Sequence, residues 1–552
     1  LIIDGTPDSL IEFGALTDNP SYNFWTGIFV ESGGDLLIRD ARIKDAFYGI
    51  NVQNAFAHSD VKMTSFENCY FGYYVINNDD IIIEDNSFTE NRYSIYIRYS
   101  DITIKGNSIK DAIYNGVFGY YSNFSAISNI FHNNTNRALN LYNSNPTVRY
   151  NDISGSDRGI YCTGYSHPNL TSKRFLGDNS VNNYIHENHY GVYNSSTSGP
   201  ELGLYSQNGN LVYGGFNFFE QNTNYDAYNN SLSADIYAQV NWWERNVPHV
   251  TGDIDTDHQA DVVMSMGPGT LPKLSTMLEE IGELYSRGLA FELDSAYTDA
   301  IAVYDSAIVN CHDCDLSISS LRSIERCYSK LDGSQGLIEQ LEVYYNQYQG
   351  EFIGFLAYYF SAGELARSGD FNGSITRLEE CVLIFETHEN GDEGAAWALF
   401  DIGQIYEMLA ELEEGLSKTS AYLAKANSSY NKILSKYPGS EAAGTLREFD
   451  QDDKPIVVLP TAYKLNHPFP NPFNPITTIK YELPEITDVS ITIYDILGRS
   501  VWAYEESAKP AGYYSLQWSG LNQNGKQAAS GVYLISFSTP EFKAVQKVLL
   551  IR

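Results

Sequence analysis

The sequence has few cysteines, few basic residues and no long apolar segment. No run of 18 or more apolar residues occurs, which excludes a membrane-spanning helix of ordinary length. Lys and Arg number 35 against 69 Asp and Glu, so the formal net charge is −34. Such an excess of negative charge disfavours nucleic acid and anionic membranes as partners. It suits cations, or simple solubility in a salty medium.

The chain has only six cysteines in 552 residues. Cys69 and Cys162 fall in distant parts of a repeat and are expected to be buried singly. Cys311 and Cys314 form one C-x-x-C element in a predicted inter-helix loop. This element is consistent with a local disulfide, a redox pair, half of a metal site or an incidental pair of loop cysteines.

The length suggests three or four domains. We place the predicted boundaries at 1–270, 271–448, 449–460 and 461–552. From Thr461 onward there are eight Lys or Arg and seven Asp or Glu, so the acidity belongs to the first 460 residues. The short third segment, FDQDDKPIVVLP, is predicted to be a linker.

An internal period of about 22 residues runs from Asp35 to Ser166. A serine recurs at this spacing, and three apolar columns share it. The serines are Ser100, Ser122, Ser144 and Ser166. The first column is Ile38, Val61, Ile83, Ile104, Ala126 and Val148; the second is Ile43, Phe66, Phe88, Ile109, Phe131 and Ile153; the third is Ile50, Tyr74, Ile95, Val117, Leu139 and Ile160.

Three short strands per period of 22 predict a right-handed parallel β-helix over residues 1–270. One turn cannot bury its own apolar face, so the turns must stack. Asn107, Asn129 and Asn151 fall at matching corners and predict a ladder of side-chain amides. The register is interrupted by an insertion near His167–Asp178, and Val240–Trp243 is expected to close the domain.

Residues 271–448 change to a helical period rich in Leu, Ala and Glu. Ala300, Tyr304 and Ala307 show a small–large–small spacing, which recurs at Ser374, Leu378 and Cys381 and at Ala426, Tyr430 and Ile433. This spacing resembles the second helix of tetratricopeptide repeats. The resemblance implies about three helix pairs in an α-helical solenoid that binds partner proteins or acts as a spacer.

Polar and aromatic residues at the corners of the predicted β-helix are the candidate binding groups. Tyr99, Tyr121 and Tyr165 precede the repeating serines and should lie on one edge, where they could form a platform for sugar rings. Aromatic corners that only cover the core are the other interpretation. The acidic and amide residues Asp79, Asp80, Asp101, Asn123 and Asn145 lie at successive corners, as a cation stripe or, better, as corner caps.

Metal ligation is indicated at one place. Asp253, Asp255 and Asp257 resemble part of a calcium loop, although the glycine and late glutamate of that loop are missing. Calcium is the one candidate cofactor, and no other cofactor motif is recognised. His186 and His189 are close in sequence but should point in different directions from a β-helix, so we expect surface polar residues.

The first domain resembles the pectate-lyase-like β-helix family, which holds both polysaccharide-cleaving enzymes and non-catalytic surface proteins. Arg42-Ile43-Lys44 matches a tripeptide of polygalacturonases, but the accompanying Gly-His-Gly is missing and Ile43 is a predicted core position. No catalytic residue is therefore assigned. We expect a non-enzymatic protein, with a polysaccharide lyase or glycoside hydrolase as the alternative.

The final segment, 461–552, predicts a small Ig-like β-sandwich. Val489, Ile491 and Ile493 alternate with polar residues, Gly498 suits a turn, and Trp518 is a predicted core residue. The segments PFPNPFNP, VSITIYDILGRSVW and SGVYLISFS occur in this order before a terminal KVLLIR. Together they resemble the C-terminal sorting domain of proteins exported by the type IX secretion system of Gram-negative bacteria.

This resemblance implies that the protein is secreted or displayed on the outer cell surface. It implies the type IX machinery as a partner and a sorting signal in the last strand, Lys547, Val548, Leu549, Leu550, Ile551 and Arg552. No signal peptide is seen, so we expect the natural N-terminus to lie upstream of Leu1. For the passenger we expect glycan or matrix binding, or an adhesive or structural role, with polysaccharide or surface proteins as ligands.

Overall fold

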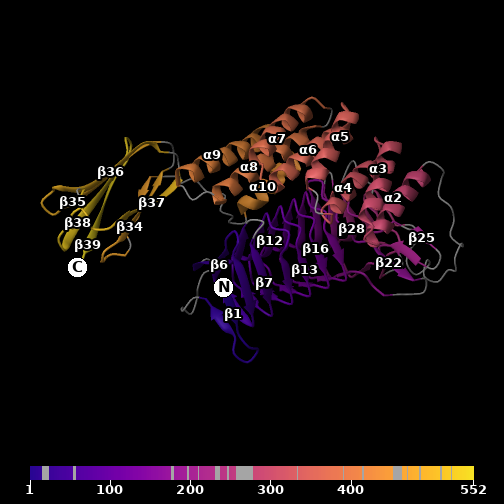
Figure 1. Ribbon diagram of the computed structural model, residues 1–552, viewed down its shortest axis with the longest axis horizontal. Helices are drawn as coiled ribbons and strands as arrows, with labels where there is room; N and C mark the ends of the chain where they lie inside the picture. Colours follow the sequence, from indigo (N-terminus) through magenta and orange to yellow (C-terminus); the bar gives the residue numbers. More distant parts are fainter. Residues whose placement is uncertain are drawn as a thin grey trace. The chain divides into compact units, whose positions relative to one another are not determined.

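The computed structural model places three parallel sheets in the first half of the chain (Figure 1). It describes all residues outside the ranges and positions that follow: 15–23, 54–56, 176–179, 196–197, 205, 209–210, 231–235, 245–247, 257–277, 332–333, 389–390, 413–415, 452–462, 469, 484–486, 510–511, 524 and 552. The described residues form two compact units, Leu1–Ile384 and Phe385–Arg552.

Each of the first seven turns contributes one short strand to each sheet, later turns extend only the second and third sheets, and all partners in these sheets are parallel. The first sheet contains β1 (Ile2–Asp4), β4 (Asp35–Arg39), β7 (His58–Lys62), β10 (Ile82–Glu84), β13 (Thr103–Lys105), β16 (Ser125–Ile127) and β19 (Thr147–Arg149). The second contains β2 (Ile11–Phe13), β5 (Ala41–Lys44), β8 (Ser65–Glu67), β11 (Ser87–Thr89), β14 (Ser108–Lys110), β17 (Ile130–His132), β20 (Asp152–Ser154), β23 (Tyr184–His186), β27 (Phe218–Glu220) and β30 (Trp242–Trp243).

The third sheet has the longest strands of the β-helix. It contains β3 (Trp25–Val30), β6 (Ala46–Gln53), β9 (Phe71–Ile76), β12 (Tyr93–Arg98), β15 (Asn115–Tyr120), β18 (Arg137–Tyr142), β21 (Arg158–Thr163), β24 (Tyr190–Asn194), β28 (Tyr225–Asn229) and β31 (Val250–Thr251). The insertion after Ser166 forms a separate antiparallel sheet of β22 (Ser172–Phe175), β26 (Leu211–Gly214) and β25 (Ser206–Asn208), and β29 (Ile236–Tyr237) pairs with β32 (Ile254–Asp255).

The predicted apolar columns form the core. Phe66, Phe88 and Ile109 occupy the same position on neighbouring strands, are fully buried, and the two phenyl rings stack 4.7 Å apart. The column continues through Ile185 and Phe219 to Trp243, which closes it as expected. One assignment was wrong: Tyr73, not Tyr74, lies between Ile50 and Ile95. Because successive side chains of a strand point to opposite faces, Tyr74 lies outside this stack.

The asparagine ladder is confirmed and is longer than predicted. Each Oδ1 accepts the backbone N–H of the asparagine one turn earlier, as Asn107 does for Asn86 at 2.9 Å and Asn129 does for Asn107 at 3.0 Å. The ladder runs on through Asn151 to Asn183. Since these residues are buried, each amide satisfies a corner backbone group that water cannot reach.

Nine helices lie in the described part of the chain after the β-helix. They are α2 (Leu278–Leu293), α3 (Tyr297–Asn310), α4 (Asp315–Tyr328), α5 (Ser334–Gln347), α6 (Phe352–Arg367), α7 (Phe371–Glu386), α8 (Asp392–Leu412), α9 (Leu416–Lys436) and α10 (Glu441–Gln451). α2 packs on α3, α5 on α6 and α8 on α9. α2 to α6 belong to the first unit, and α10 extends into the predicted linker. None of these helices is long and apolar enough to cross a membrane.

The second unit ends in two antiparallel sheets. One contains β33 (Lys464–Leu465), β34 (Thr477–Leu483) and β37 (Gly512–Trp518); the other contains β36 (Ser500–Lys509), β35 (Thr487–Asp495), β38 (Gly531–Ser538) and β39 (Lys543–Leu550) in that order. Val489, Ile491 and Ile493 are buried, and Trp518 lies in the same core, as predicted. Gly498 has a φ of 76° in the turn between β35 and β36.

Candidate functional site

The predicted tyrosine edge exists but is covered. Tyr99 and Tyr121 stack 5.5 Å apart, and Tyr165 meets the rings of Tyr359 and Phe360 on α6. The three predicted tyrosines are 2, 5 and 3% exposed. Our interpretation of Tyr99, Tyr121 and Tyr165 as a platform for sugars is therefore corrected, because no ring offers a free face.

A single glycine allows α6 to come this close. A Cβ added at Gly363 would lie 2.3 Å from the ring of Tyr121, too near for any side chain there. The tyrosine corner is thus a packing surface for a helix far away in the sequence. The repeat predicted the alignment of these rings but gave no sign of the element that covers them.

The acidic and amide corner residues are caps, as the sequence favoured. Asp79 Oδ1 accepts the N–H of Asp101, Asp101 Oδ1 accepts that of Asn123, and Asn123 Oδ1 accepts that of Asn145, at 2.7, 2.6 and 3.0 Å. Asn145 Oδ1 continues the series to His167 at 2.9 Å. Each oxygen satisfies the backbone of the next turn.

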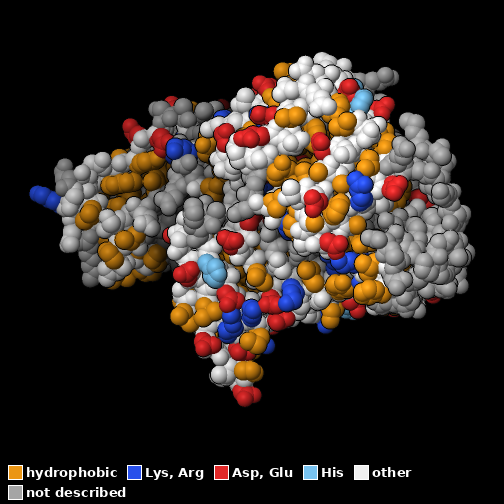
Figure 2. Space-filling view, turned by 45° about the vertical axis from the view of Figure 1, so that its right-hand side comes forward, with side chains coloured by type: hydrophobic (Ala, Val, Ile, Leu, Met, Phe, Trp, Pro, Cys, Tyr) orange, Lys and Arg blue, Asp and Glu red, His pale blue; other side chains and the backbone are white. Residues whose placement is uncertain are grey.

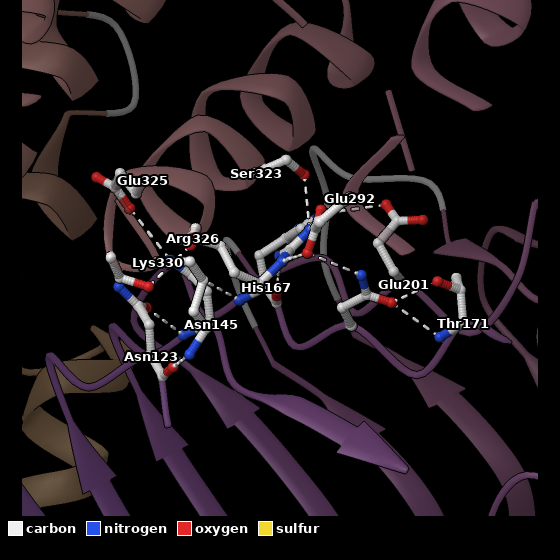
Figure 3. A network of polar contacts seen from close by, with 12 residues as sticks. Asn123, Asn145, His167, Thr171, Glu201, Glu292, Ser323, Glu325, Arg326 and Lys330 are labelled. Atoms are coloured by element: carbon white, nitrogen blue, oxygen red, sulfur yellow. Dashed lines mark hydrogen bonds and ion pairs between the residues drawn. The ribbon is translucent and has the colours of Figure 1, made fainter. Parts of the chain in front are cut away.

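The outer side of this corner receives arginines from the helices. We call the corner residues Asp79, Asp101, Asn123, Asn145 and His167, together with the helix residues that contact them, the polar seam. Figure 3 shows its part around Asn145, His167 and Arg326. Arg367 of α6 pairs with Asp101 at 2.9 Å and donates to the carbonyl of Tyr121 at 2.6 Å. Arg322 of α4 donates to Asn145 Oδ1 at 3.1 Å and pairs with Glu325 at 2.6 Å. The cations on the predicted stripe are therefore side chains of the protein itself.

The seam continues to α2 through a second buried pair. Arg326 of α4 contacts both carboxylate oxygens of Glu292, at 2.6 and 3.0 Å, and donates to the carbonyl of His167 at 3.0 Å. Burial alone would raise the pKa of Glu292, but Arg326 holds that pKa below its usual value. Two charged hydrogen bonds in this geometry compensate for the loss of hydration of both ions.

Other groups in the seam have shifted protonation equilibria. Burial raises the pKa of Glu325 to about 7, more than Arg322 lowers it. Burial lowers the pKa of His167, although Glu201, 2.9 Å away, acts in the opposite direction. Such a His–Glu pair is a familiar catalytic combination, but both side chains are at most 4% exposed. The seam is therefore closed to a substrate and holds the helices on the β-helix.

The other candidate metal ligands that the structure describes have separate partners. Asp255 accepts a hydrogen bond from Gln239 at 2.6 Å, the carbonyl of Asp253 accepts from Asn229, and Asp257 lies outside the described residues, so calcium here stays a prediction. Among the residues that the structure describes, no three His, Cys, Asp or Glu form a metal-binding group. His186 and His189 pair with different partners, Asp152 and Asp157.

Two sequence elements with alternative interpretations have defined partners in the structure. Cys311 and Cys314 form a disulfide in the loop between α3 and α4. Arg42 and Lys44, which flank the buried Ile43, form surface ion pairs with Glu67 and Glu12. Figure 2 shows that acidic and basic side chains lie interspersed on one face of the molecule.

An open groove of about 320 Å³ lies on the β-helix, where the first sheet turns into the second. Three serine hydroxyls from successive turns line it, one strand apart in the second sheet, with an exposed methionine and an exposed leucine among the other lining residues. The hydroxyls are Ser65, Ser87 and Ser108, and the apolar groups are Met63 and Leu10. This groove was not predicted, since a serine on the outward face of a strand is ordinary.

The last strand is fixed by the proline-rich segment. Asn471 donates its amide to the carbonyl of Lys547 and accepts the N–H of Leu549, both at 2.9 Å. Phe473 adds backbone hydrogen bonds to Leu549 and Ile551, both 3.0 Å long. Val548 and Leu550 are fully buried, Lys547 is exposed, and Arg552 lies outside the described residues. The predicted sorting strand is thus an integral strand, β39.

The comparisons with known proteins agree with two parts of this description. Residues 15–145 match a family model described as right-handed β-helix region, and residues 476–540 match the FlgD Ig-like domain. The first match supplies the handedness of the β-helix. No curated protein matches the chain.

Three solved structures show weak similarity. Dimeric latent PorU from Porphyromonas gingivalis is 20% identical over 16% of this chain and 9% of its own, with a TM-score of 0.15. PorZ, described as an essential surface component of the type-IX secretion system of the same bacterium, is 24% identical over 16 and 12%, with a TM-score of 0.13. The DNA glycosylase AlkC from Pseudomonas fluorescens, bound to DNA containing an abasic site analogue, is 11% identical over 50 and 96%, with a TM-score of 0.12. The match thus spans about a tenth of PorU and PorZ.

Proposed function

We propose that this chain is a secreted or surface-displayed, non-enzymatic protein exported by type IX secretion, with residues 461–552 as its sorting domain. The observation that carries the proposal is a contact between two of the motifs that resemble a type IX sorting domain, the proline-rich segment and the C-terminal strand. Asn471 and Phe473 of PNPFNP bind the edge of β39, which contains KVLL, and Phe473 also bonds the following Ile551, although more than 70 residues separate the two motifs. On this proposal the sorting signal is a strand of the folded domain rather than an unstructured C-terminal peptide.

A deletion tests the proposal. Removal of Lys547–Arg552 from the full chain should leave the protein in the periplasm of a bacterium that has type IX secretion. The exposed residue Leu383 on α7 supplies the control, since Leu383→Ser removes an apolar side chain that belongs to the first unit and not to β39. Thermal unfolding should show the transition of the first unit unchanged in both variants. Normal surface levels of the deleted form would refute the sorting assignment and the localisation with it.

For the passenger, we propose binding of an extended glycan or matrix polymer in the open groove. Its three serines repeat at the spacing of neighbouring strands, roughly 4.8 Å, and can bond successive hydroxyls of one chain. The apolar side chains of Met63 and Leu10 can pack on ring carbons. A glycan array with the purified protein tests this, together with Ser87→Trp to fill the groove and Thr147→Trp as a control on the first sheet. Release of reducing sugars would instead assign a polysaccharide-degrading enzyme.

The helices we propose to be tetratricopeptide-like pairs, of which those in the first unit brace the β-helix. Two of the pairs are packed in the same way, with a glycine of one helix against a tyrosine ring of the other. A Cβ added at Gly288 on α2 would lie 2.4 Å from Tyr304 on α3, and one added at Gly403 on α8 would lie 2.2 Å from Tyr430 on α9. In the first unit, arginines on α4 and α6 bind the β-helix corner. A replacement of Gly403 by Ala should lower the unfolding temperature of the second unit by several degrees, whereas Gly444→Ala, in open space on α10, should not.

A further inference from the structure

The end of the four-stranded sheet brings together motifs that are distant in sequence. β35 and β39 run in the same direction on either side of β38. Asp495, the last residue of β35, pairs with Tyr533, and Tyr533 pairs with Val548. The turn that follows Asp495 therefore lies at the same end of the sheet as Ile551, about 10 Å away across two strand spacings. The C-terminus in Figure 1 marks this end.

The turn at this end is built rigidly around one carboxylate. Asp495 Oδ1 accepts the N–H of Leu497 at 2.9 Å and that of Arg499 at 3.0 Å. Its other oxygen accepts from Arg499 Nε at 2.7 Å, and Gly498 supplies the left-handed conformation that the turn needs. The backbone is thus held by Asp495, Gly498 and Arg499, while the side chains at the other two positions of DILGR are free to serve another purpose.

Those other positions carry exposed apolar side chains. Ile496 is 75% and Leu497 71% exposed, at a turn where polar residues are usual. Ile551, beside Phe473, is 48% exposed at the same end. We call Ile496, Leu497 and Ile551 the apolar end. A pinned turn loses little conformational entropy when it binds, so such side chains are suited to insert into a pocket.

Three exposed basic side chains lie around the apolar end. Arg499 has a side chain 73% exposed, and Lys547 is exposed on β39. Exposed Lys526 lies in the loop whose Gln523 donates to the carbonyl of Val501, next to the turn. Asp495 is the acid of the turn itself, and Arg499 already pairs with it. A partner surface with an apolar pocket and carboxylates at its rim is complementary to this arrangement.

We propose that the apolar end is the surface by which the sorting domain binds its protein receptor, with Ile496 and Leu497 inserted into an apolar pocket bordered by acidic groups. This rests on the proposed function and extends it, because the receptor would read a turn as well as the last strand. β39 and the proline-rich segment would then position Ile551 next to the turn. A membrane surface is the competing partner that the experiment must separate.

The test uses the full chain in a bacterium with type IX secretion. The variant Ile496→Ser with Leu497→Ser should lower the surface-displayed amount at least fivefold and accumulate in the periplasm. Val545→Thr is the matched control, since Val545 is 59% exposed on β39 but away from this end, and its export should stay within twofold of the wild type. Should the double variant unfold at a lower temperature than the wild type, Leu497→Ser and Ile551→Ser separately decide the outcome by the same measure.

The results separate the two proposals. If the folded double variant is exported normally while the form lacking Lys547–Arg552 stays in the periplasm, the receptor contact is overturned and the sorting assignment stands. Normal export of both would overturn both. Flotation of the purified protein with phosphatidylethanolamine–phosphatidylglycerol vesicles gives the third arm: binding that the double variant loses would assign the apolar end to lipid and overturn the protein receptor.

Discussion

The β-helix and the C-terminal sandwich solve the same problem of burying short strands in different ways. In the β-helix, Phe88 packs between Phe66 and Ile109 of the neighbouring turns, so the core is a line of nearest neighbours. In the sandwich, Ile491, Ile493 and Trp518 share one cluster closed on all sides. Further turns can therefore be added to the β-helix with the same packing, whereas the sandwich has a set number of strands and two defined ends. A fixed end is where a recognition surface can be built.

The first way to sharpen this comparison is a truncation in the core of the β-helix. Phe88→Ala should lower the free energy of unfolding of the first unit by about 3–5 kcal/mol, because the buried ring leaves a cavity. The transition of the second unit should not move. Phe218→Ala, on the outward face of the same sheet, is the control and should cost clearly less. Equal losses for the two would contradict the inward column.

The second prediction removes a charge from the polar seam. Arg326→Met leaves Glu292 buried without its cation, which should cost about 3–5 kcal/mol in urea unfolding of the first unit. Arg287→Met, an exposed position on α2, should stay within about 0.5 kcal/mol of the wild type. A loss as small as that of the control would mean that the helices do not depend on the seam.

The third prediction concerns pH. Since burial raises the pKa of Glu325 from 4.5 to about 7, the folded state holds the proton more tightly than the unfolded state. Stability from this group is therefore full below pH 4.5 and falls by up to about 3 kcal/mol as the pH rises to above 7. Glu325→Gln should flatten this part of the stability curve, measured by unfolding between pH 5 and 8. Identical slopes for the variant and the wild type would contradict it.

The smallest effect is expected in the sandwich. Asn471→Ala removes two hydrogen bonds to β39 at an exposed edge and should cost about 1 kcal/mol. Asn471→Asp keeps the bond from Leu549 but not the one to Lys547, so its loss should be smaller. Hydrogen exchange at Leu549 should rise in the alanine variant. Unchanged exchange there would mean that β39 is held without the proline-rich segment.

The sequence predicted what repeats and missed what does not. The inward columns and the asparagine ladder follow from spacing alone. The single wrong assignment within the columns arose because Tyr73 and Tyr74 are identical neighbouring residues whose side chains point to opposite faces of the strand. The cover over Tyr99, Tyr121 and Tyr165 could not be predicted, because α6 has no periodic relation to the corner it binds. For α4, the other helix of the polar seam, a signal was present: Arg322, Glu325 and Arg326 lie three and four residues apart and so share one face of that helix.

The apolar end shows the same limit in the second unit. Spacing identified DILGR as a turn and KVLLIR as a strand, but only the pairing of β35, β38 and β39 puts them at one end of the sheet. Distance across a sheet is not encoded in any local pattern. Register therefore decides which motifs can act together.

The central claim is that residues 461–552 are an address independent of what they carry. The most direct measurement fuses this segment, behind a signal peptide, to an unrelated reporter that stays periplasmic by itself, and follows the reporter in a bacterium with type IX secretion. We predict that the fusion reaches the cell surface and that deletion of Lys547–Arg552 from it restores periplasmic retention. A fusion that remains in the periplasm while the full chain is exported would contradict the claim.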